Sequence, residues 1–148
     1  MFYTTYLDDI LIYSEDPLEH KEHVKKVLER LRATGLQADI KKCEFGVTRT
    51  KYLDFIVSTS GLEVDPEKVL IVKDWKAPCS VKGVQLFLGF CSFYWRFIPN
   101  FGKIAKPLTR LTHIGVEFDF DDAYQDALER LKSHLIEAPV LAHYDPTC

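Results

Sequence analysis

The chain has 148 residues, of which 47% are hydrophobic and 13% aromatic, which suits one packed domain or two small ones and excludes a disordered chain. No apolar run approaches the roughly 20 residues that cross a bilayer, and the N-terminus does not resemble a secretory signal. The four cysteines form no C-x-x-C pair, so we expect reduced thiols in an intracellular protein with no membrane contact.

The net charge of -3 conceals a basic middle segment between acidic flanks. Residues 1–65 carry a net charge of -3, residues 66–112 a net +6, and residues 113–148 a net -6. A basic segment of this kind favours a polyanionic partner, although charged helix faces are most often simply solvated.

The first elements predicted are two short strands with a turn between them. FYTTY and ILIYS are β-branched and aromatic runs separated by LDD, which is typical of an antiparallel hairpin. Apolar residues at helical spacing predict a helix from about Leu18 to Ala33, and Gly35 suits its C-terminal cap. An extended piece, LQADIKKCEFG, and a second hairpin with its turn at Ser60-Gly61 follow.

The remainder of the chain is predicted to be mostly helical. Asp65 is a suitable N-cap and Pro66 a suitable first helical residue. The predicted helices run from Pro66 to about Trp75, from Ser80 to about Phe97, from Phe101 to Leu111 and from about Asp121 to Leu135. The end, APVLAHYDPTC, has strand character. The fold class expected is therefore α+β, with hairpins and one helix followed by a helical region.

The turn of the first hairpin holds two adjacent carboxylates, Asp8 and Asp9. Like charges side by side repel, so the pair is either solvated or bound to a cation. Mg²⁺ suits such a pair, because it prefers oxygen ligands and takes one or two carboxylates plus substrate phosphates. The dipeptide by itself favours the solvated turn, and a second pair, Asp121-Asp122, suits a helix N-terminus.

The stretch YLDDILIYS resembles the Y-x-D-D motif of reverse transcriptases. Other blocks match the same family in order and spacing: HKEHVKKVLERLRATGLQADIKKCEF, FIVSTSGLEVDPEKVLIVKDW, LFLGFCSFYWRFIPNFGKIAKPLTRL and APVLAHYDP. Over nearly its whole length, the chain is therefore similar to the polyproteins of gypsy-class long-terminal-repeat retrotransposons.

The resemblance implies three segments. Residues 1–64 would be the C-terminal half of a polymerase palm, residues 65–112 a helical thumb, and residues 113–148 the start of a connection toward a ribonuclease H domain. The function implied is that of a part of an RNA-directed DNA polymerase, which adds dNTPs to a primer 3′ hydroxyl by two-metal nucleotidyl transfer. Its partner would be an RNA/DNA or DNA duplex primer–template.

The resemblance also implies roles for residues of both hairpins. Asp8 and Asp9 would be two of the three catalytic carboxylates and ligands of Mg²⁺ or Mn²⁺, with Asp8 preferred as the direct ligand. Tyr6 would lie near the primer end. Asp54 and Phe55, in the hairpin from Lys51 to Val64, would belong to the primer grip that positions the 3′ hydroxyl.

One face of the predicted thumb is expected to contact nucleic acid. Gln85, Gly89 and Phe93 are spaced i, i+4, i+8 and share one helix face. A small residue between an amide and an aromatic ring permits close approach to a minor groove, and the family uses a similar face. The alternative is a core phenylalanine and a helix-packing glycine. The cations expected to make binding salt-dependent are Lys82, Arg96, Lys103, Lys106 and Arg110.

Several features put catalysis by this chain in doubt. The family's third carboxylate and nucleotide-holding fingers precede the YLDD hairpin, and its ribonuclease H acids follow the connection, so we expect the chain alone to be inactive. The substitutions that depart from the family pattern are Asp54 for a usual glycine, Gly83 for a polar helix former, Glu117 for a proline and Phe120 for a tryptophan. They suggest a decayed or repurposed copy.

Two non-catalytic alternatives stay open. One is a nucleic-acid-binding module, and the other is a repurposed protein-interaction domain that binds a protein partner or itself through surface exposed by the missing palm half. His20 and His23 are predicted to lie on the solvent side of their helix without a metal role.

Overall fold

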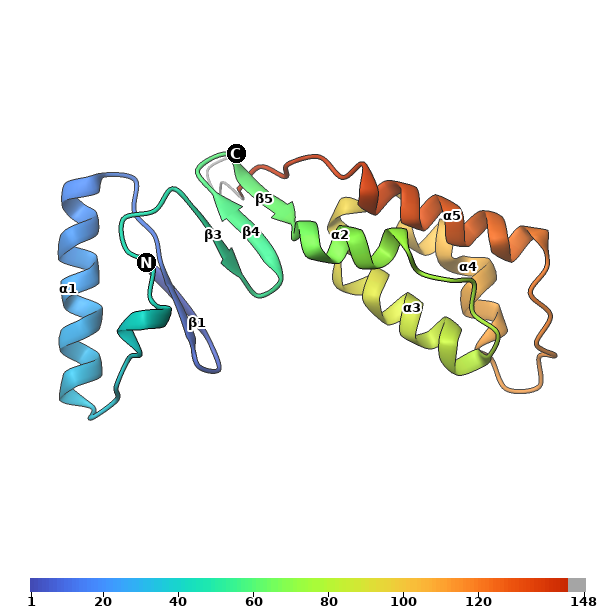
Figure 1. Cartoon of the computed structure of the whole chain (residues 1–148), viewed down its shortest axis with the longest axis horizontal. Coiled ribbons are helices and arrows are strands. Elements are labelled where there is room, and N and C mark those ends of the chain that lie inside the picture. Colours follow the sequence, from blue (N-terminus) through green and yellow to red (C-terminus); the bar gives the residue numbers. More distant parts are fainter. Residues whose placement is uncertain (144–148) are drawn as a thin grey trace. The chain divides into compact units, whose positions relative to one another are not determined.

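A computed structural model of the chain describes residues 1–143. It divides into two compact units, which we name the N-terminal unit (Met1–Leu53) and the C-terminal unit (Asp54–Cys148). Within residues 1–143 the elements are small β-hairpins and five α-helices, so the predicted α+β class is confirmed (Figure 1). Among the described residues, no helix is both long enough and apolar enough to cross a membrane.

The N-terminal unit is a hairpin, a long helix and a short following segment. Its elements are β1 (Tyr3–Tyr6), β2 (Asp9–Ile12), α1 (Pro17–Ala33), the 3-10 turn η1 (Ile40–Lys42) and β3 (Arg49–Tyr52). Strands β1 and β2 are antiparallel, and their register runs from Tyr3 opposite Ile12 to Tyr6 opposite Asp9. The predicted first hairpin is therefore confirmed, with Leu7 and Asp8 as its two-residue turn.

Helix α1 spans Pro17–Ala33, close to the predicted range, and Asp16 is its N-cap. The Asp16 carboxylate accepts hydrogen bonds from the backbone N–H groups of Leu18 (2.6 Å) and Glu19 (3.3 Å), and Pro17 occupies the first turn. Gly35 follows the helix with a φ of +73°, a conformation that glycine adopts without strain.

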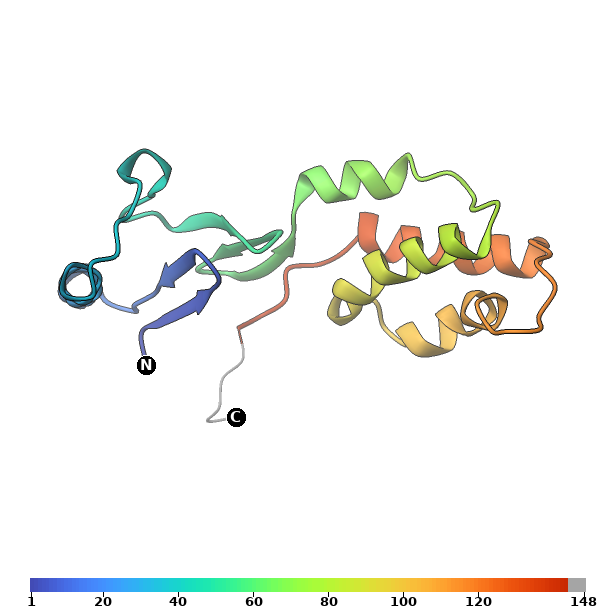
Figure 2. The ribbon, with the colours of Figure 1, turned by 90° about the horizontal axis from the view of Figure 1, so that it is seen from below.

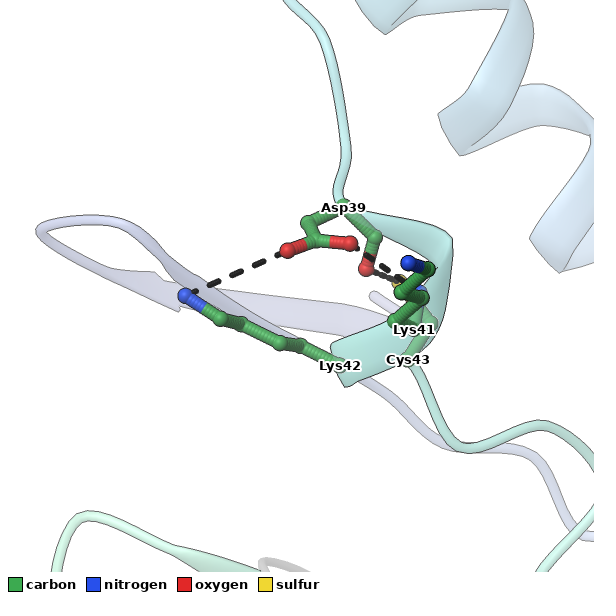
Figure 3. Close-up of polar contacts among 4 residues, drawn as sticks. All are labelled: Asp39, Lys41, Lys42 and Cys43. Carbon is green, nitrogen blue, oxygen red and sulfur yellow. Dashed lines mark hydrogen bonds and ion pairs between the residues drawn. The ribbon is translucent and has the colours of Figure 1, made fainter.

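The prediction of an extended segment over LQADIKKCEFG is wrong in the middle of that stretch, because the chain forms η1 there. The Asp39 carboxylate accepts a hydrogen bond from the Lys41 backbone N–H (3.1 Å) and lies 4.0 Å from the Lys42 ammonium (Figure 3). The Cys43 thiol donates to the Asp39 carbonyl at 3.3 Å. One aspartate thus closes the turn, because its short side chain competes with extended backbone pairing.

The C-terminal unit is a hairpin followed by helices. Its elements are β4 (Phe55–Ser58), β5 (Gly61–Val64), α2 (Pro66–Lys73), α3 (Val81–Phe93), the 3-10 turn η2 (Trp95–Phe97), α4 (Phe101–Leu111) and α5 (Asp122–Ile136). Strands β4 and β5 are antiparallel, and their register runs from Phe55 opposite Val64 to Ser58 opposite Gly61. The second predicted hairpin is therefore confirmed, but its turn is Thr59-Ser60 and not Ser60-Gly61, because Gly61 already pairs with Ser58.

The helices of the C-terminal unit share one hydrophobic core. Helix α5 packs against α2 and α4, and α4 packs against α3 (Figure 2). The side chains with less than 2% of their surface exposed are Phe87, Leu108, Leu111, Leu128, Leu131, Leu135, Val72, Val84 and Cys91. All of them belong to this unit, whereas Val27 is the one buried apolar side chain described in the N-terminal unit. Most of the hydrophobic stabilisation therefore resides in the C-terminal unit.

Helix α3 ends earlier than the sequence predicts. The Ser80 hydroxyl accepts a hydrogen bond from the Gly83 N–H at 3.1 Å and starts the helix as expected. The predicted end near Phe97 is wrong, because the chain tightens into η2 after Tyr94. Asn100, with a φ of +57°, then redirects the backbone into α4.

The segment after α5 returns to the second hairpin. Leu141 forms a β-bridge with Leu62, with reciprocal backbone hydrogen bonds of 2.7 and 2.8 Å. His143 Nε2 lies 2.6 Å from the Ser58 carbonyl oxygen. The predicted strand character of APVLAHYDPTC is thus seen as one bridge, and residues 144–148 of that stretch lie outside the described residues.

The carboxylate hairpin and a candidate nucleic-acid interface

The hairpin of the N-terminal unit presents two carboxylates at its tip. Asp8 is the second turn residue, and Asp9 is the first residue of β2, directly opposite Tyr6. Cross-strand partners share one face of a sheet, so Asp9 and Tyr6 lie side by side. Leu7 adopts a φ of +50°, which costs an L-residue roughly 1–2 kcal/mol. The tip therefore has a specific, strained conformation.

The two carboxylates are exposed and available to a cation. Among residues 1–143, neither Asp8 nor Asp9 has an ion-pair partner that would neutralise it. Their oxygen atoms are the hard donors that Mg²⁺ and Mn²⁺ prefer. The same described residues contain no group of three or more histidine, cysteine or acidic side chains that could hold a metal. The hairpin thus fits a divalent cation as a source of two ligands.

Helix α3 exposes the face that the sequence singles out. Gln85 and Gly89 are exposed, and Phe93 has 51% of its surface exposed. A Cβ placed on Gly89 would meet no atom within 4 Å, so this glycine packs against no neighbouring helix. The alternative of a core phenylalanine and a helix-packing glycine is therefore wrong. The opposite face of α3 supplies the buried residues Val84 and Phe87.

The exposed face of α3 continues into the second hairpin. The ring of Phe93 stacks on that of Phe55, with centroids 5.1 Å apart and planes 21° apart. Phe55 also contacts Tyr94 edge to face at 5.3 Å. The structure thus brings together Phe55, expected in the primer grip, and Phe93, expected at the duplex.

Asp54 occupies a turn position that favours glycine. Leu53 and Asp54 have φ values of +51° and +64°, a left-handed conformation that aspartate tolerates better than most residues. The left-handed conformation explains why the family pattern has glycine at this position, because glycine adopts it without strain. The Asp54 carboxylate lies 3.8 Å from the Lys68 ammonium, and its backbone carbonyl accepts a 2.9 Å hydrogen bond from the Tyr94 hydroxyl.

The Tyr94 phenol is buried at this contact. Its side chain is 2% exposed, and burial is the main reason that the pKa of its hydroxyl is raised well above the usual range. The negative charges of Asp54 and Asp65 raise that pKa further. The hydroxyl therefore stays protonated and remains a hydrogen-bond donor.

Exposed cations surround the same helices. No acidic residue occurs between Asp74 and Glu117. The Arg96 guanidinium lies 5.9 Å from the centre of the Trp95 ring, and both residues help to line a hollow with Lys103. The exposed basic residues of this stretch after α2 are Lys76, Lys82, Arg96, Lys103, Lys106 and Arg110. All of the cations predicted for the interface are thus accessible.

Gly83 also departs from the family pattern, and close packing against the preceding loop explains why a glycine stands there. A Cβ at Gly83 would lie 3.1 Å from the Pro78 Cβ and 3.4 Å from the Ser80 hydroxyl oxygen. The loop before α3 therefore approaches the helix more closely than a side chain would allow comfortably.

One polar cluster was not predicted from the sequence. The hydroxyl oxygen of Ser14 lies 3.1 Å from His20 Nδ1 and 2.6 Å from His23 Nδ1. The His23 ring also stacks on Phe2, with centroids 4.1 Å apart. The prediction that these histidines face solvent is wrong, since both are half-buried against the first hairpin. Helical spacing does not predict this cluster, because Ser14 precedes the helix that carries the two histidines.

Comparisons with known proteins place these features in a family. The sequence profile described as reverse transcriptase (RNA-dependent DNA polymerase) matches residues 1–86. The transposon Tf2-3 polyprotein of Schizosaccharomyces pombe is 34% identical over 140 residues, which cover 95% of this chain and 10% of that polyprotein. The retrovirus-related Pol polyprotein from transposon opus of Drosophila melanogaster is 34% identical over 148 residues, covering 93% of this chain and 15% of its own length.

Solved structures agree with the sequence comparison. The foamy viral protease-reverse transcriptase dRH in complex with double-stranded DNA superposes with a TM-score of 0.85 and 28% identity, over 97% of this chain and 26% of that one. The foamy viral enzyme in complex with an RNA/DNA hybrid gives a TM-score of 0.80 and 28% identity, over 95% and 19% of the two chains. The chain spans about a tenth of the Tf2-3 polyprotein, and it belongs to the reverse transcriptase (RNA-dependent DNA polymerase) family.

Proposed function

We propose that this chain is the part of an RNA-directed DNA polymerase that grips a primer–template duplex and supplies two catalytic carboxylates. The observation that carries the proposal is the exposed face of Gln85, Gly89 and Phe93 on α3, in a segment with a net charge of +6. Such a face suits a duplex, since shape and sugar contacts dominate recognition in the minor groove. The foamy viral relatives are described in complex with double-stranded DNA and with an RNA/DNA hybrid, which supports a duplex partner.

The three predicted segments are part of the proposal. Residues 1–64 would act as the C-terminal half of the palm, residues 65–112 as the thumb and residues 113–148 as the start of the connection. Asp54 and Phe55 would serve as primer-grip residues at the hairpin that contacts α3. The stacking of Phe55 on Phe93 supports a grip that is continuous with the duplex-binding face.

Asp8 and Asp9 would hold Mg²⁺ or Mn²⁺ at the primer terminus. When bound, two such ions supply activation of the 3′ hydroxyl and stabilisation of the leaving oxygen in an in-line displacement. The carboxylates contribute oxygen ligands and negative charge, and Tyr6, opposite Asp9, would flank the primer end. The incoming dNTP would be bound by parts of the enzyme that precede the YLDD hairpin in the family. We therefore expect no catalysis by these 148 residues alone, because phosphoryl transfer depends on complete positioning.

Duplex binding is tested by fluorescence anisotropy with labelled DNA duplex and RNA/DNA hybrid across a range of salt concentrations. Engagement of five exposed cations would give a slope of log affinity against log salt of about -4.5 on B-DNA. Arg96→Ala should reduce the magnitude of the slope by about 1, and Gln85→Ala should weaken binding with little change in slope. Arg130→Ala and Gln125→Ala on α5 are matched controls, because they remove the same groups from the acidic segment. Salt-insensitive or absent binding would overturn the proposal.

The expected inactivity of the chain alone is tested by primer extension on an RNA template with Mg²⁺ or Mn²⁺. We expect no extension by the chain alone. Extension that disappears in Asp8→Asn would overturn the expectation of inactivity and would assign catalysis to the YLDD pair.

A second candidate function, protein binding by the N-terminal unit, is favoured by its exposed apolar side chains. Leu7 is 88% exposed, Ile40 77% and Leu18 74%, whereas Val27 is the one buried apolar residue described there. A protein partner that covered these side chains would remove apolar surface from water, which favours association. Light scattering after size-exclusion chromatography, with nuclease present, tests self-association. A concentration-independent monomer would exclude a stable homodimer.

A further inference from the structure

We infer that Tyr94 is a positioning residue that sets the primer-grip turn relative to the duplex-binding face of α3; this inference rests on the proposed function. The Tyr94 hydroxyl donates a 2.9 Å hydrogen bond to the backbone carbonyl of Asp54. The two residues belong to the same unit but are 40 positions apart in sequence. The contact therefore joins the end of α3 to the turn that precedes β4.

The tyrosine ring is held from several sides, so its hydroxyl has a defined position. Phe93 and Phe55 contact it edge to face at 5.0 Å and 5.3 Å, and Phe90 contacts it in a tilted arrangement at 5.4 Å, measured between ring centres. Aromatic pairs in such geometries add to the stabilisation from buried area. A phenol fixed in this way fixes the carbonyl that it binds.

Asp54 has a second contact, which comes from helix α2. The Lys68 ammonium, on α2, lies 3.8 Å from the Asp54 carboxylate. Partly exposed ion pairs contribute little energy, so this contact orients the side chain more than it stabilises the fold. Two helices of the C-terminal unit thus converge on one turn residue, through its backbone and through its side chain.

These contacts fix the position of the primer-grip turn relative to the duplex-binding face of α3. Phe55 follows Asp54 directly and stacks on Phe93, which is the last residue of the Gln85–Gly89–Phe93 face. A duplex lying on α3 would therefore meet the turn at a fixed distance along its axis. We expect the turn to recognise where a primer strand ends, while the helix face recognises the duplex itself.

The test compares two duplexes that have the same base-paired length. One has a recessed 3′ primer end with a template overhang, and the other is blunt. The wild-type chain should bind the recessed end several-fold more tightly than the blunt duplex. Tyr94→Phe removes the hydroxyl and keeps the ring, so it should retain blunt-duplex affinity within about twofold and lose the preference for the recessed end. A merely structural role would weaken both duplexes alike.

Three variants make the outcome specific. Gln85→Ala should weaken both duplexes and keep their ratio. Tyr124→Phe, which removes a hydroxyl from a half-buried tyrosine of α5 that contacts Phe120, should change neither. If Tyr94→Phe does not fold, as judged by its thermal unfolding, Lys68→Met tests the same turn through a side chain outside the aromatic cluster and should reduce the ratio.

The results separate this inference from the proposed function. Salt-sensitive binding with a recessed-end preference that persists in Tyr94→Phe would overturn the positioning role and leave duplex binding intact. Binding without any preference in the wild-type chain would do the same. Absence of duplex binding by the wild-type chain would overturn both.

Discussion

The hydroxyl of Tyr94 binds the carbonyl oxygen of Asp54 at 2.9 Å, and Asp54 has a φ of +64°. A left-handed residue is thus held in place by a tertiary hydrogen bond to its backbone. Because the acceptor is a backbone atom, the bond does not depend on which side chain stands at position 54. Substitutions there can therefore separate backbone strain from the ion pair with Lys68.

We expect Asp54→Gly to leave the free energy of unfolding within about 0.5 kcal/mol of the wild-type value. Glycine relieves left-handed strain, which offsets its greater unfolded-state entropy and the loss of a weak ion pair. Asp54→Ala should cost about 1 kcal/mol, because alanine gains no relief at positive φ. Urea unfolding monitored by circular dichroism measures both. An alanine variant as stable as the glycine variant would contradict the strain argument.

Gly61→Ala should be among the most destabilising single changes in the chain. A Cβ at Gly61 would lie 1.9 Å from the Leu141 carbonyl oxygen, and the φ of +140° is unfavourable for any other residue. The segment carrying Leu141 must then move, which breaks its bridge to Leu62. We expect a loss of about 2–4 kcal/mol from strain and the lost backbone pairing, measured by urea unfolding.

Gly115→Ala is the control for the Gly61 variant. Gly115 also has a positive φ, of +84°, but its Cβ would meet no atom within 4 Å. Gly115→Ala should therefore lower the free energy of unfolding only by the backbone strain, which is about 1–2 kcal/mol. Equal losses in the two variants would show that the clash with Leu141 is relieved without cost.

Local sequence patterns were sufficient to predict most helices and strands. Tertiary contacts account for the differences between the predicted and the observed elements. Asp65 caps α2 as predicted, because capping depends on a few neighbouring residues. The early end of α3 was not predictable, since the aromatic contacts of Tyr94 favour the turn that follows it. The bridge of Leu141 to Leu62 also joins positions with no common local pattern.

The candidate site was predictable in its residues and only partly in its geometry. The family resemblance and helical spacing together singled out Asp8, Asp9 and the α3 face. The exposure of Phe93 depends on which face of α3 the bundle buries, which spacing by itself leaves open. The hydroxyl contact of Tyr94 was missed, because hydrogen bonding between distant residues leaves no periodic pattern.

The N-terminal unit should exchange its amide hydrogens faster than the C-terminal unit. Helix α1 contributes Val27 as its one buried side chain, whereas α5 buries Ala127, Leu128, Leu131 and Leu135. Regions with few buried apolar side chains open at lower free energy. Hydrogen exchange followed by mass spectrometry should show α1 exchanging at least tenfold faster than α5. Equal protection would indicate additional stabilisation of the N-terminal unit, for example by self-association.

Cys91 should make the stability of the protein depend on alkaline pH. Burial raises the pKa of its thiol from 9.0 to about 12. The folded state therefore holds a proton that the unfolded state loses between these values. The contribution is fully present below pH 9 and decreases as the pH rises toward 12. Between pH 8 and 10 it should lower the free energy of unfolding by about 1 kcal/mol.

Cys91→Ala removes this titration and is the comparison for the wild-type chain. The variant is less stable at every pH because it leaves a cavity, but its stability should fall less between pH 8 and 10. Urea unfolding at both values measures the difference. Alkylation of the native chain at pH 8 should modify the exposed Cys79 and spare Cys91. Rapid modification of Cys91 would contradict its burial.

Gly89→Ala should stabilise the fold and weaken duplex binding. Gly89 lies within α3, and its Cβ would meet nothing within 4 Å, so alanine gains about 0.5–1 kcal/mol of helix stability. The added methyl group stands between Gln85 and Phe93, where the proposed minor-groove approach requires a flat surface. Thermal unfolding and duplex affinity should therefore change in opposite directions, with affinity falling several-fold. Ser133→Ala, on the exposed surface of α5, should raise stability without changing affinity. If Gly89→Ala binds duplex as tightly as the wild-type chain, this face of α3 does not contact the groove.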